Sequence, residues 1–418
     1  MKILRFPSYY TPEVVSSSHL GRDLEEAYVK AGFEIEIYAP TPTRGVSEEV
    51  YKKYKKIPYE EYRDGKVKVH RFPMRREKKN SISRALRYSS VLKKQKKFGF
   101  RAEGVDIVLG SSTPPTLGLT CAKVAKTLSK KYGRKVPFVY TLQDVFPDSL
   151  ATTGLAKPGS FLYKMGTKIA NKIYESADLI ITISEDIKKN IMAKGVPEEK
   201  IRVIYNWIDT SAVKPVPKEE NKLFDELGLS HDTFKIVYAG NLGMAQGVDV
   251  LLDAAELMSD ESDVEFIIFG RGAREGEIKA RAEKLSNVRV LPLMPEDRIP
   301  EVYSLGDACA VTCRRGTGAA GVPSKTWSIM ACGTPLLVAF DKESELADII
   351  NRSGAGLVSE PEDASELVEN IKKLKDSHET ASSMCVAARK YAEEFASREI
   401  ATAKYVEIIK SFVKDENK

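Results

Sequence analysis

The chain has 418 residues, of which 42% are hydrophobic and 30% are charged, with a net charge of +6. This composition is typical of a soluble globular protein of two or three domains, and no apolar run reaches the ~18–20 residues that a membrane-spanning helix needs. The five cysteines and four histidines show no spacing typical of a metal site. Residues 1–7 contain a proline too early for a secretory signal. A cytoplasmic protein without a metal is therefore expected.

Strands and helices alternate through the first half of the chain. Helices are expected at residues 19–31, 115–132 and 161–175, and from residue 185 onward. Strands are expected at residues 2–6, 34–39, 67–72, 105–110, 137–142, 179–183 and 201–205. This alternation predicts right-handed crossovers and a parallel, doubly wound sheet.

A linker is expected at residues 206–218, which include Pro215 and Pro217. The alternation of strands and helices then begins again, with strands at residues 235–239, 265–269, 288–291, 308–311 and 336–340. The predicted fold class is α/β, with two doubly wound, Rossmann-like domains that face a cleft. The predicted boundaries are 1–208 for the first domain, 209–395 for the second, and 396–418 for a helix that crosses back to the first.

Residues 318–335 are a candidate anion site. A glycine-rich loop follows a predicted strand, Pro323 suits the first turn of a helix, and Gly333 ends that helix. Free N–H groups at such a helix start attract anions, and Lys325 adds a full positive charge. A diphosphate receptor is one interpretation. An ordinary strand–loop–helix crossover with a surface lysine is the other.

Glycine turns follow three predicted strands of the second half, at residues 240–243, 270–272 and 318–321. Such turns allow backbone N–H groups to approach an anion closely, so a nucleotide diphosphate is predicted. The first half has no clean Gly-x-Gly-x-x-Gly motif, which disfavours a dinucleotide oxidoreductase. No Asp-x-Asp motif ends a strand, which disfavours a metal-chelated sugar nucleotide.

Lysine and arginine are concentrated in residues 75–101, where only Glu77 is acidic. Apolar residues recur in this segment at roughly helical spacing, so it is predicted to be a basic, moderately amphipathic helix that contacts an anionic membrane surface. A solvated helix face is the alternative interpretation. No nucleic-acid-binding module is apparent, so no nucleic-acid partner is expected.

Several motifs spread over essentially the whole chain resemble one known family. They are Tyr-Thr-Pro-Glu at residues 10–13, Gln-Asp-Val-Phe-Pro-Asp at 143–148, Val-Ile-Tyr-Asn-Trp-Ile-Asp at 203–209, Tyr-Ala-Gly-Asn-Leu-Gly at 238–243 with Gln-Gly at 246–247, and the segment 321–335. With these motifs the chain resembles the retaining glycosyltransferases of family 4, which have the GT-B fold. It is most similar to the group that assembles O-antigen, capsule and exopolysaccharide, which contains the N-acetyl-fucosamine transferases.

The resemblance implies a metal-independent, retaining transferase that needs no cofactor. The second domain would bind a UDP-sugar, with an N-acetylated hexosamine or deoxy-amino sugar expected, and the first would bind a polyprenyl-diphosphate-linked sugar acceptor. The enzyme would act at the cytoplasmic face of the membrane. The implied catalytic residues are Lys325 and Asp144. The implied acceptor-binding residues are Ser16, Ser17, Ser18, Gln143 and Asp144. The implied donor-binding residues are Gly240, Asn241, Leu242, Gly243, Gln246, Gly270, Arg271, Gly272, Pro323, Ser324, Lys325, Ser328 and Glu345.

The chain departs from the family pattern at several of these positions. Ala320 and Ser328 stand where the family commonly has two glutamates, and Asn241 and Gln246 stand where it has arginine and lysine. Lys325 is therefore the first candidate cation for the leaving diphosphate, ahead of the arginines at 271, 314 and 315. Gln143 replaces the family's histidine, and the serines at 16–18 replace a glycine pair.

Two alternative functions remain open at the level of sequence. One is a non-hydrolysing UDP-sugar epimerase on the same fold, which would convert the donor without an acceptor. The other is a non-catalytic, sugar-nucleotide-binding scaffold subunit that has lost the chemistry together with the family's glutamates, and would bind without turnover.

Overall fold

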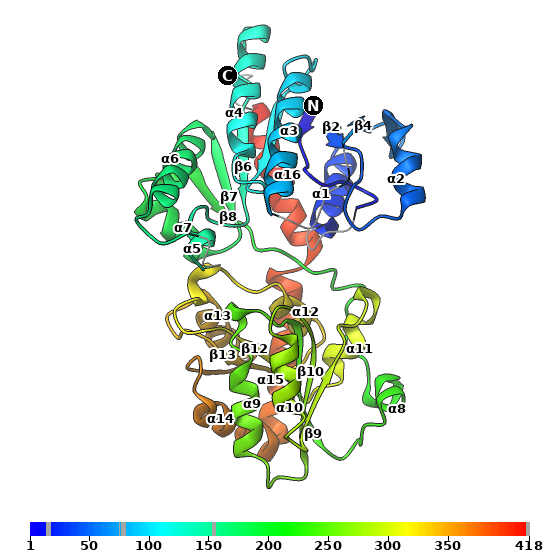
Figure 1. The fold of residues 1–418 in the computed structure, drawn as a ribbon, viewed down its shortest axis with the longest axis vertical. Helices are drawn as coiled ribbons and strands as arrows, with labels where there is room; N and C mark the ends of the chain where they lie inside the picture. Colours follow the sequence, from blue (N-terminus) through cyan, green and yellow to red (C-terminus); the bar gives the residue numbers. More distant parts are fainter. Residues whose placement is uncertain (14–17, 75, 77–80, 153–155, 415–418) are drawn as a thin grey trace. The chain divides into compact units, whose positions relative to one another are not determined.

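The computed structural model describes residues 1–13, 18–74, 76, 81–152 and 156–414 (Figure 1). The chain divides into two compact units. The first unit comprises Met1–Ile183, Ile187–Ile204 and Thr402–Lys418, and the second comprises Ser184–Asp186 and Tyr205–Ala401. The chain thus enters the second unit after Ile204 and returns at Thr402, whereas the sequence-based boundaries stand at 208 and 396.

The first unit is built on an eight-stranded sheet with the order β3-β4-β2-β1-β5-β6-β7-β8. Among the described strands only the β3–β4 pair is antiparallel. The strands are β1 (Lys2–Arg5), β2 (Glu34–Pro40), β3 (Tyr59–Tyr62), β4 (Val67–Phe72), β5 (Ile107–Ser111), β6 (Phe138–Leu142), β7 (Leu179–Thr182) and β8 (Ile201–Val203).

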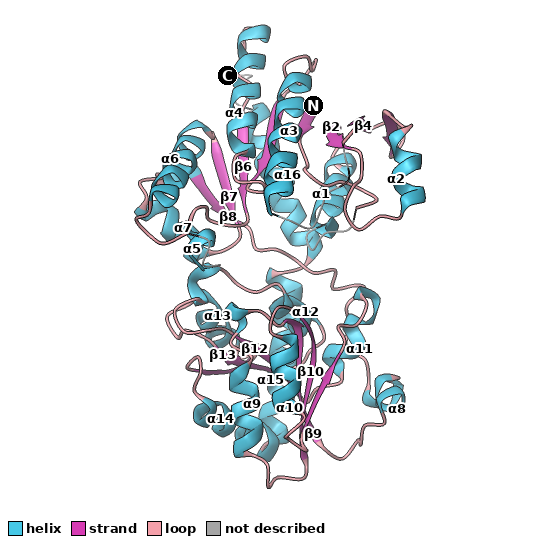
Figure 2. Cartoon of the chain, viewed as in Figure 1, coloured by secondary structure: helices cyan, strands magenta, loops and turns pink. Residues whose placement is uncertain are grey.

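Helices cover this sheet (Figure 2). They are α1 (Ser18–Lys30), α2 (Glu48–Lys55), α3 (Ser81–Gly99), α4 (Leu117–Tyr132), α5 (Asp148–Thr152), α6 (Phe161–Ser176), α7 (Glu185–Ala193) from Ile187 onward and α16 (Arg398–Lys414) from Thr402 onward. Helix α4 shows why the sequence folds in this way, since Leu117, Cys121, Val124 and Leu128 form one buried stripe. Helix α2 and strand β3 lie in a lysine- and tyrosine-rich segment without such a stripe, and sequence analysis missed both.

The second unit has a six-stranded sheet in which every pair is parallel, with the order β11-β10-β9-β12-β13-β14. The strands are β9 (Phe234–Asn241), β10 (Val264–Arg271), β11 (Val288–Leu291), β12 (Ala308–Thr312), β13 (Leu336–Ala339) and β14 (Gly356–Ser359). The helices are α8 (Leu223–Leu227), α9 (Asp249–Leu257), α10 (Glu275–Ala282), α11 (Ile299–Ser304), α12 (Lys325–Ala331), α13 (Glu345–Ser353), α14 (Ala364–Asp376) and α15 (His378–Phe395). Short 3₁₀ turns occur at Glu198–Lys200, Lys218–Glu220, Met244–Gln246, Glu296–Arg298 and Gly318–Ala320.

Strand β9 lies at the centre of this sheet and is buried on both faces. Ile236 and Tyr238 belong to one hydrophobic core cluster, whereas Val237 and Ala239 belong to another. Successive side chains of a strand point to opposite faces, so a continuous apolar run fits a parallel sheet covered on both sides. The predicted class of two parallel, doubly wound α/β folds is confirmed.

Candidate functional site

The carboxyl ends of β9 and β12 define a topological switch point in the second unit. From β9 the chain proceeds to β10 and β11 on one side, and then returns to place β12 on the other side of β9. Ligands of doubly wound sheets bind outside the carboxyl ends of the strands at such a point. The segments that leave these two strands, residues 241–247 and 313–325, contain most of the residues predicted to bind a donor.

Lys325, the first residue of α12, lies at this switch point. Its Nζ is 3.7 Å from the centroid of the Tyr238 ring, and a Cβ added to Gly240 would lie 2.7 Å from the same nitrogen. Glycine at 240 therefore leaves room for the lysine beside the end of β9. Within the described residues, no carboxylate or carbonyl oxygen forms an ion pair or hydrogen bond with Lys325 Nζ.

The surroundings of Lys325 lower the pKa of its amine from the ordinary lysine value to about 7. The main cause is burial, which disfavours the charged form, while the nearby thiol of Cys309 has a smaller opposite effect. Near neutral pH, the amine is therefore only partly protonated. An anion placed next to it would favour the protonated, positively charged form.

Hydrogen bonds connect the loop after β9 with the end of β12 and the loop that follows it. The Nδ2 of Asn241 donates to Gln246 Oε1 (3.2 Å), and Thr312 Oγ1 donates to the Gln246 backbone oxygen (2.6 Å). The Arg314 N–H donates to the Ala245 carbonyl (2.9 Å), so a backbone hydrogen bond also joins the two loops. The two neutral residues that replace family cations are thus hydrogen-bonded to each other.

Three of the glycines predicted at this edge have packing roles. A Cβ on Gly270 would lie 2.5 Å from Leu242 Cγ, and a Cβ on Gly272 would lie 2.5 Å from the Leu242 carbonyl oxygen. A Cβ on Gly243 would lie 2.5 Å from Gln246 Oε1. Leu242 is buried, and its N–H donates to the Arg271 carbonyl (3.0 Å). These glycines therefore allow close packing of the loop, and their contact with a donor stays a prediction.

The prediction that the 318–321 turn offers its amides to an anion is wrong for Gly318. The N–H of Gly318 donates to Asp341 Oδ2 (2.8 Å), and the N–H of Gly316 donates to Asp341 Oδ1 (2.9 Å). Asp341 lies two residues after the end of β13, and its carboxylate already accepts hydrogen bonds from both amides. Sequence analysis missed this role, although an acidic residue directly after a buried strand was the available signal.

Other predicted donor residues occupy varied environments. Glu345 is buried, and both of its carboxylate oxygens already accept hydrogen bonds: Tyr205 Oη lies 2.5 Å from Oε1, and the backbone N–H groups of Glu185 and Asp186 lie 2.7 and 3.3 Å from Oε2. Its predicted donor contact therefore competes with three bonds inside the second unit. The remaining predicted residues are the buried Ser328, the half-buried Pro323, and the exposed Ser324 and Arg271.

Arg314 and Arg315, which the sequence offered as further cations for the leaving diphosphate, are exposed, and each lies near an acidic residue. Arg314 Nε lies 3.8 Å from a Glu362 oxygen, and Arg315 Nη1 lies 3.1 Å from a Glu360 oxygen. Both arginines are thus partly neutralised by local ion pairs. Lys325, in contrast, lies beside Gly240 at the end of β9 and has no acidic partner among the described residues.

Two predicted residues of the first unit, Gln143 and Asp144, lie at the carboxyl end of β6. The backbone N–H groups of Gln143 and Asp144 donate to Ser112 Oγ, at 3.0 and 3.3 Å, and Ser112 follows the neighbouring strand β5. Asp144 is an exposed residue whose carboxyl group lies against the protein, and this partial burial raises its pKa. Ser16 and Ser17 lie outside the described residues, as does the side chain of Ser18, the first residue of α1.

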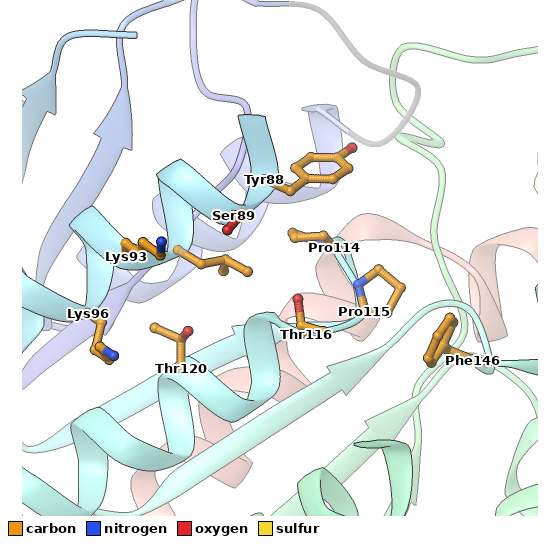
Figure 3. Close-up of a pocket in the computed structure, with 10 residues that line it drawn as sticks. Tyr88, Ser89, Lys93, Lys96, Pro114, Pro115, Thr116, Thr120 and Phe146 are labelled. Atoms are coloured by element: carbon orange, nitrogen blue, oxygen red, sulfur yellow. The ribbon is translucent and has the colours of Figure 1, made fainter. Parts of the chain in front are cut away.

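A pocket of about 410 Å³ opens between α3 and α4 in the first unit (Figure 3). Its walls are mainly apolar, and the lysines at 93 and 96 lie beside them. Neither lysine forms an ion pair with a described carboxylate. The lining residues are Tyr88, Ser89, Leu92, Lys93, Lys96, Pro114, Pro115, Thr116, Thr120 and Phe146. Sequence analysis noted the basic helix but missed this pocket.

The basic surface predicted at residues 75–101 is smaller than expected. Arg87 is buried, with Nε donating to Thr43 Oγ1 (3.2 Å) and Nη2 donating to the Ser8 carbonyl (3.1 Å). Lys94 Nζ donates to the Pro73 carbonyl (2.7 Å). Residues 75 and 77–80, and the side chain at 84, lie outside the described part of the chain. Lys93, Lys96 and Lys97 remain as the accessible lysines of α3.

Neither a metal cluster nor a membrane-spanning helix is found in the described part of the chain. No group of three or more His, Cys, Asp or Glu residues there is arranged to hold a metal ion. Likewise, no described helix is both long enough and apolar enough to cross a membrane. All five cysteines are free thiols, and only Cys385 is not buried.

The two halves of the chain match two family models. The model described as "Glycosyltransferase Family 4" matches residues 21–212, and the model described as "Glycosyl transferases group 1" matches residues 219–391. The chain belongs to the GT-B glycosyltransferases of the family 4 type. The predicted family is thereby confirmed, and so is glycosyltransferase as the class of enzyme.

Curated relatives of this glycosyltransferase have names from cell-surface polysaccharide synthesis. It is 26% identical over 426 residues to the "Putative colanic acid biosynthesis glycosyl transferase WcaI" of Escherichia coli strain K12, and the match covers 99% of each chain. It is 28% identical over 278 residues to the "Probable glycosyltransferase WbjE" of Pseudomonas aeruginosa, a match covering 66% of this chain and 67% of the relative.

Solved structures show the same fold in distant glycosyltransferases. Sucrose-phosphate synthase from Thermosynechococcus elongatus is similar with a TM-score of 0.72 and 15% identity, over 99% of both chains. HepE of Anabaena in complex with UDP-glucose is similar with a TM-score of 0.69 and 18% identity, over 98% of this chain and all of that one. At these identities the likeness concerns the fold of this glycosyltransferase.

Proposed function

We propose that this glycosyltransferase moves a sugar from a UDP-linked donor, with retention of the anomeric configuration, onto a polyprenyl-diphosphate-linked or other glycan acceptor in cell-surface polysaccharide synthesis. An N-acetylated hexosamine or a deoxy-amino sugar is the proposed donor sugar, and the proposed location is the inner face of the cytoplasmic membrane. The name of the colanic acid relative supports the pathway class. The structural similarity to a protein solved with UDP-glucose supports the nucleotide.

The position of Lys325 carries this proposal. A lysine without an acidic partner among the described residues, at the switch point between β9 and β12, suits the diphosphate of the donor. The diphosphate would favour protonation of the amine, and the resulting ammonium would stabilise the charge that develops on the departing group. Arg271, exposed at the carboxyl end of β10, is the second proposed cation.

The proposed reaction uses no protein nucleophile and no metal. The acceptor hydroxyl approaches the anomeric carbon from the face that the UDP leaves. As the bond from that carbon to the phosphate oxygen breaks, the acceptor oxygen forms the new glycosidic bond, and the acceptor proton passes to the leaving phosphate. Configuration is retained because attack and departure share one face. Lys325 acts as an electrostatic stabiliser in this scheme.

The first unit is proposed to hold the acceptor. Asp144 and Gln143, held by Ser112 at the end of β6, would bond acceptor hydroxyls. The pocket between α3 and α4 suits a lipid-linked acceptor, because Lys93 and Lys96 would pair with its phosphates while Leu92, Pro114 and Pro115 contact the hydrocarbon (Figure 3).

A thermal-shift panel of nucleotides and UDP-sugars tests the donor assignment. UDP and one UDP-amino sugar should raise the unfolding midpoint equally with EDTA and with added Mg²⁺, because a ligand that binds the folded state stabilises it by mass action. A shift that needs Mg²⁺ would contradict metal independence, and no shift with any nucleotide would contradict the donor site. Binding without transfer to any acceptor would favour the scaffold alternative, and epimer formation from donor alone would favour the epimerase.

A further inference from the structure

The first turns of α6 expose a group of large apolar side chains. Phe161 is 83% exposed, Leu162 is 45% exposed and Met165 is 44% exposed. The helix start itself is well defined, because Ser160 Oγ accepts a hydrogen bond from the Tyr163 N–H (3.3 Å). Single exposed apolar residues are ordinary on protein surfaces, but three within five residues form a contiguous patch of the kind that marks an interaction site.

The opposite side of α6 already has its packing partner. Gly166, Ala170 and Ile173 are buried, and a Cβ on Gly166 would lie 2.8 Å from Pro147 Cβ. The exposed apolar residues therefore do not belong to a helix face that packs on the sheet. They lie on a second face of α6, which points toward solvent.

Lysines surround and extend this outward face. Lys157, Lys164, Lys168 and Lys172 are all exposed, and none forms an ion pair with a described carboxylate. The sequence contains no aspartate or glutamate between Asp148 and Glu175. The charge of the segment is thus entirely positive, which disfavours a basic partner and suits an anionic one.

The spacing on α6 separates an apolar end from a basic end. Phe161, Met165, Lys168 and Lys172 follow one another at intervals of four, three and four residues, so they share one face of the helix. The apolar side chains lie in the first turns and the lysines further along. Lysine stems can lie along an apolar surface while their ammonium groups reach phosphate, as in helices that dip into the membrane interface.

We propose that the start of α6, residues 160–172, inserts Phe161, Leu162 and Met165 into an anionic lipid bilayer, with Lys164, Lys168 and Lys172 on the lipid phosphates. This surface differs from the α3 surface, where the described large apolar side chains that are exposed are Leu86, at 68%, and Phe100 just after the helix, at 36%. The proposal agrees with a membrane-bound acceptor and does not depend on the identity of the sugar donor.

A tryptophan reporter tests insertion directly. The two native tryptophans, Trp207 and Trp327, are 4% and 1% exposed, so new emission from Phe161→Trp should report the local environment. With vesicles of phosphatidylcholine and phosphatidylglycerol in equal parts, Phe161→Trp should shift to the blue and be quenched by brominated acyl chains. Val386→Trp, at a site 69% exposed on α15, is the matched control and should show neither effect. No shift at position 161, or equal shifts at both positions, would overturn the proposal.

Sedimentation with the same vesicles separates the apolar and electrostatic contributions. Phe161→Ser/Met165→Ser should weaken partitioning by about tenfold or more at both low and high salt. Lys164→Gln/Lys168→Gln/Lys172→Gln should weaken it mainly at low salt. Leu257→Ser, which changes a leucine 61% exposed on α9, should leave it unchanged. Unchanged sedimentation of both α6 variants would overturn the proposal.

Two further readouts complete the test. A blue shift at position 161 that grows with protein concentration and needs no vesicles would assign the patch to a second copy of the chain and overturn the proposal. The UDP thermal shift of each α6 variant should equal that of the parent protein. Failure of membrane insertion is therefore distinguishable from failure of the donor site.

Discussion

The ammonium of Lys325 lies 3.7 Å from the centre of the Tyr238 ring, beside a glycine that leaves room for it. The π face of an aromatic ring attracts a cation but does not neutralise it as a carboxylate would. Tyr238 therefore positions the amine of Lys325 in the space beside Gly240, where no described carboxylate neutralises the positive charge once an anionic ligand favours the protonated form. The predictions that follow begin with this residue.

Lys325→Met should lower turnover by about a hundredfold, because removal of one preorganised charge at a leaving group commonly costs that much. The folded state should not lose stability, since an unpaired buried amine is replaced by an apolar side chain of similar length. Initial rates and denaturant midpoints check both statements. Lys373→Met, at an exposed position on α14, is the control and should match the parent protein.

The stability difference between the parent protein and Lys325→Met should depend on pH. The folded-state pKa of Lys325 is about 7, whereas the ordinary lysine value is 10.5. Between these values the unfolded chain binds the proton and the folded chain does not, so the parent gains stability as the pH rises. The slope is at most about 1.4 kcal/mol per pH unit. Urea unfolding of both proteins at pH 6, 7.5 and 9 measures the difference; a difference that stays constant would show that the amine titrates normally.

Gly270→Ala should destabilise the second unit by about 1–3 kcal/mol, because the new methyl group overlaps Leu242. Leu242→Ala alone should cost about 2–5 kcal/mol, since Leu242 is buried. The double variant should cost clearly less than the sum, because the smaller side chain makes room for the methyl group. Denaturant unfolding of the four proteins gives this cycle. Strict additivity would mean that the two residues do not touch.

Asp341→Ala should loosen the loop that leads to Lys325. The substitution leaves the N–H groups of Gly316 and Gly318 without their acceptor, at a cost of about 1–3 kcal/mol. We expect KM for the donor to rise and proteolysis near residues 314–320 to become faster. Asp363→Ala is a useful comparison, because it removes the Asp363 cap at the start of α14 and should lower stability without changing KM.

Lys93→Gln/Lys96→Gln should raise KM for a lipid-linked acceptor and leave KM for a short, water-soluble acceptor unchanged. The physical reason is that the pocket between α3 and α4 offers these two lysines to a lipid phosphate. Steady-state kinetics with both acceptors make the comparison. An equal rise for both acceptors would place the lysines near the sugar instead of the lipid.

The sheets could be predicted from the sequence because their strands are continuous apolar runs between helices. The segment 308–340 illustrates this, since β12 and β13 lie within one residue of the strands expected at 308–311 and 336–340. The position of Lys325 after β12 could also be predicted, because the order of elements along the chain sets it.

The contacts that define the site could not be predicted in the same way. Asp341 accepts a hydrogen bond from the Gly318 amide, 23 positions away in the sequence, and Glu345 accepts one from Tyr205, 140 positions away. The burial of Arg87 and the exposure of Phe161 could not be predicted from the sequence either. A charged residue in a basic run is buried, and an apolar residue at the start of a helix is exposed. The local sequence pattern shows whether a residue is polar or apolar. It does not show which distant residues pack against that residue and bury it.

Both edges of the eight-stranded sheet are built so that no further strand adds easily. At one edge β3 has four residues, runs antiparallel to β4 and includes Glu60 and Glu61. At the other edge β8 has three residues, with the exposed Arg202 at its middle. Short, charged edge strands offer few unpaired backbone groups to a second chain. The first unit can therefore remain dispersed at high local concentration, as the proposed gathering on a membrane surface would require, without its sheet joining that of a neighbour.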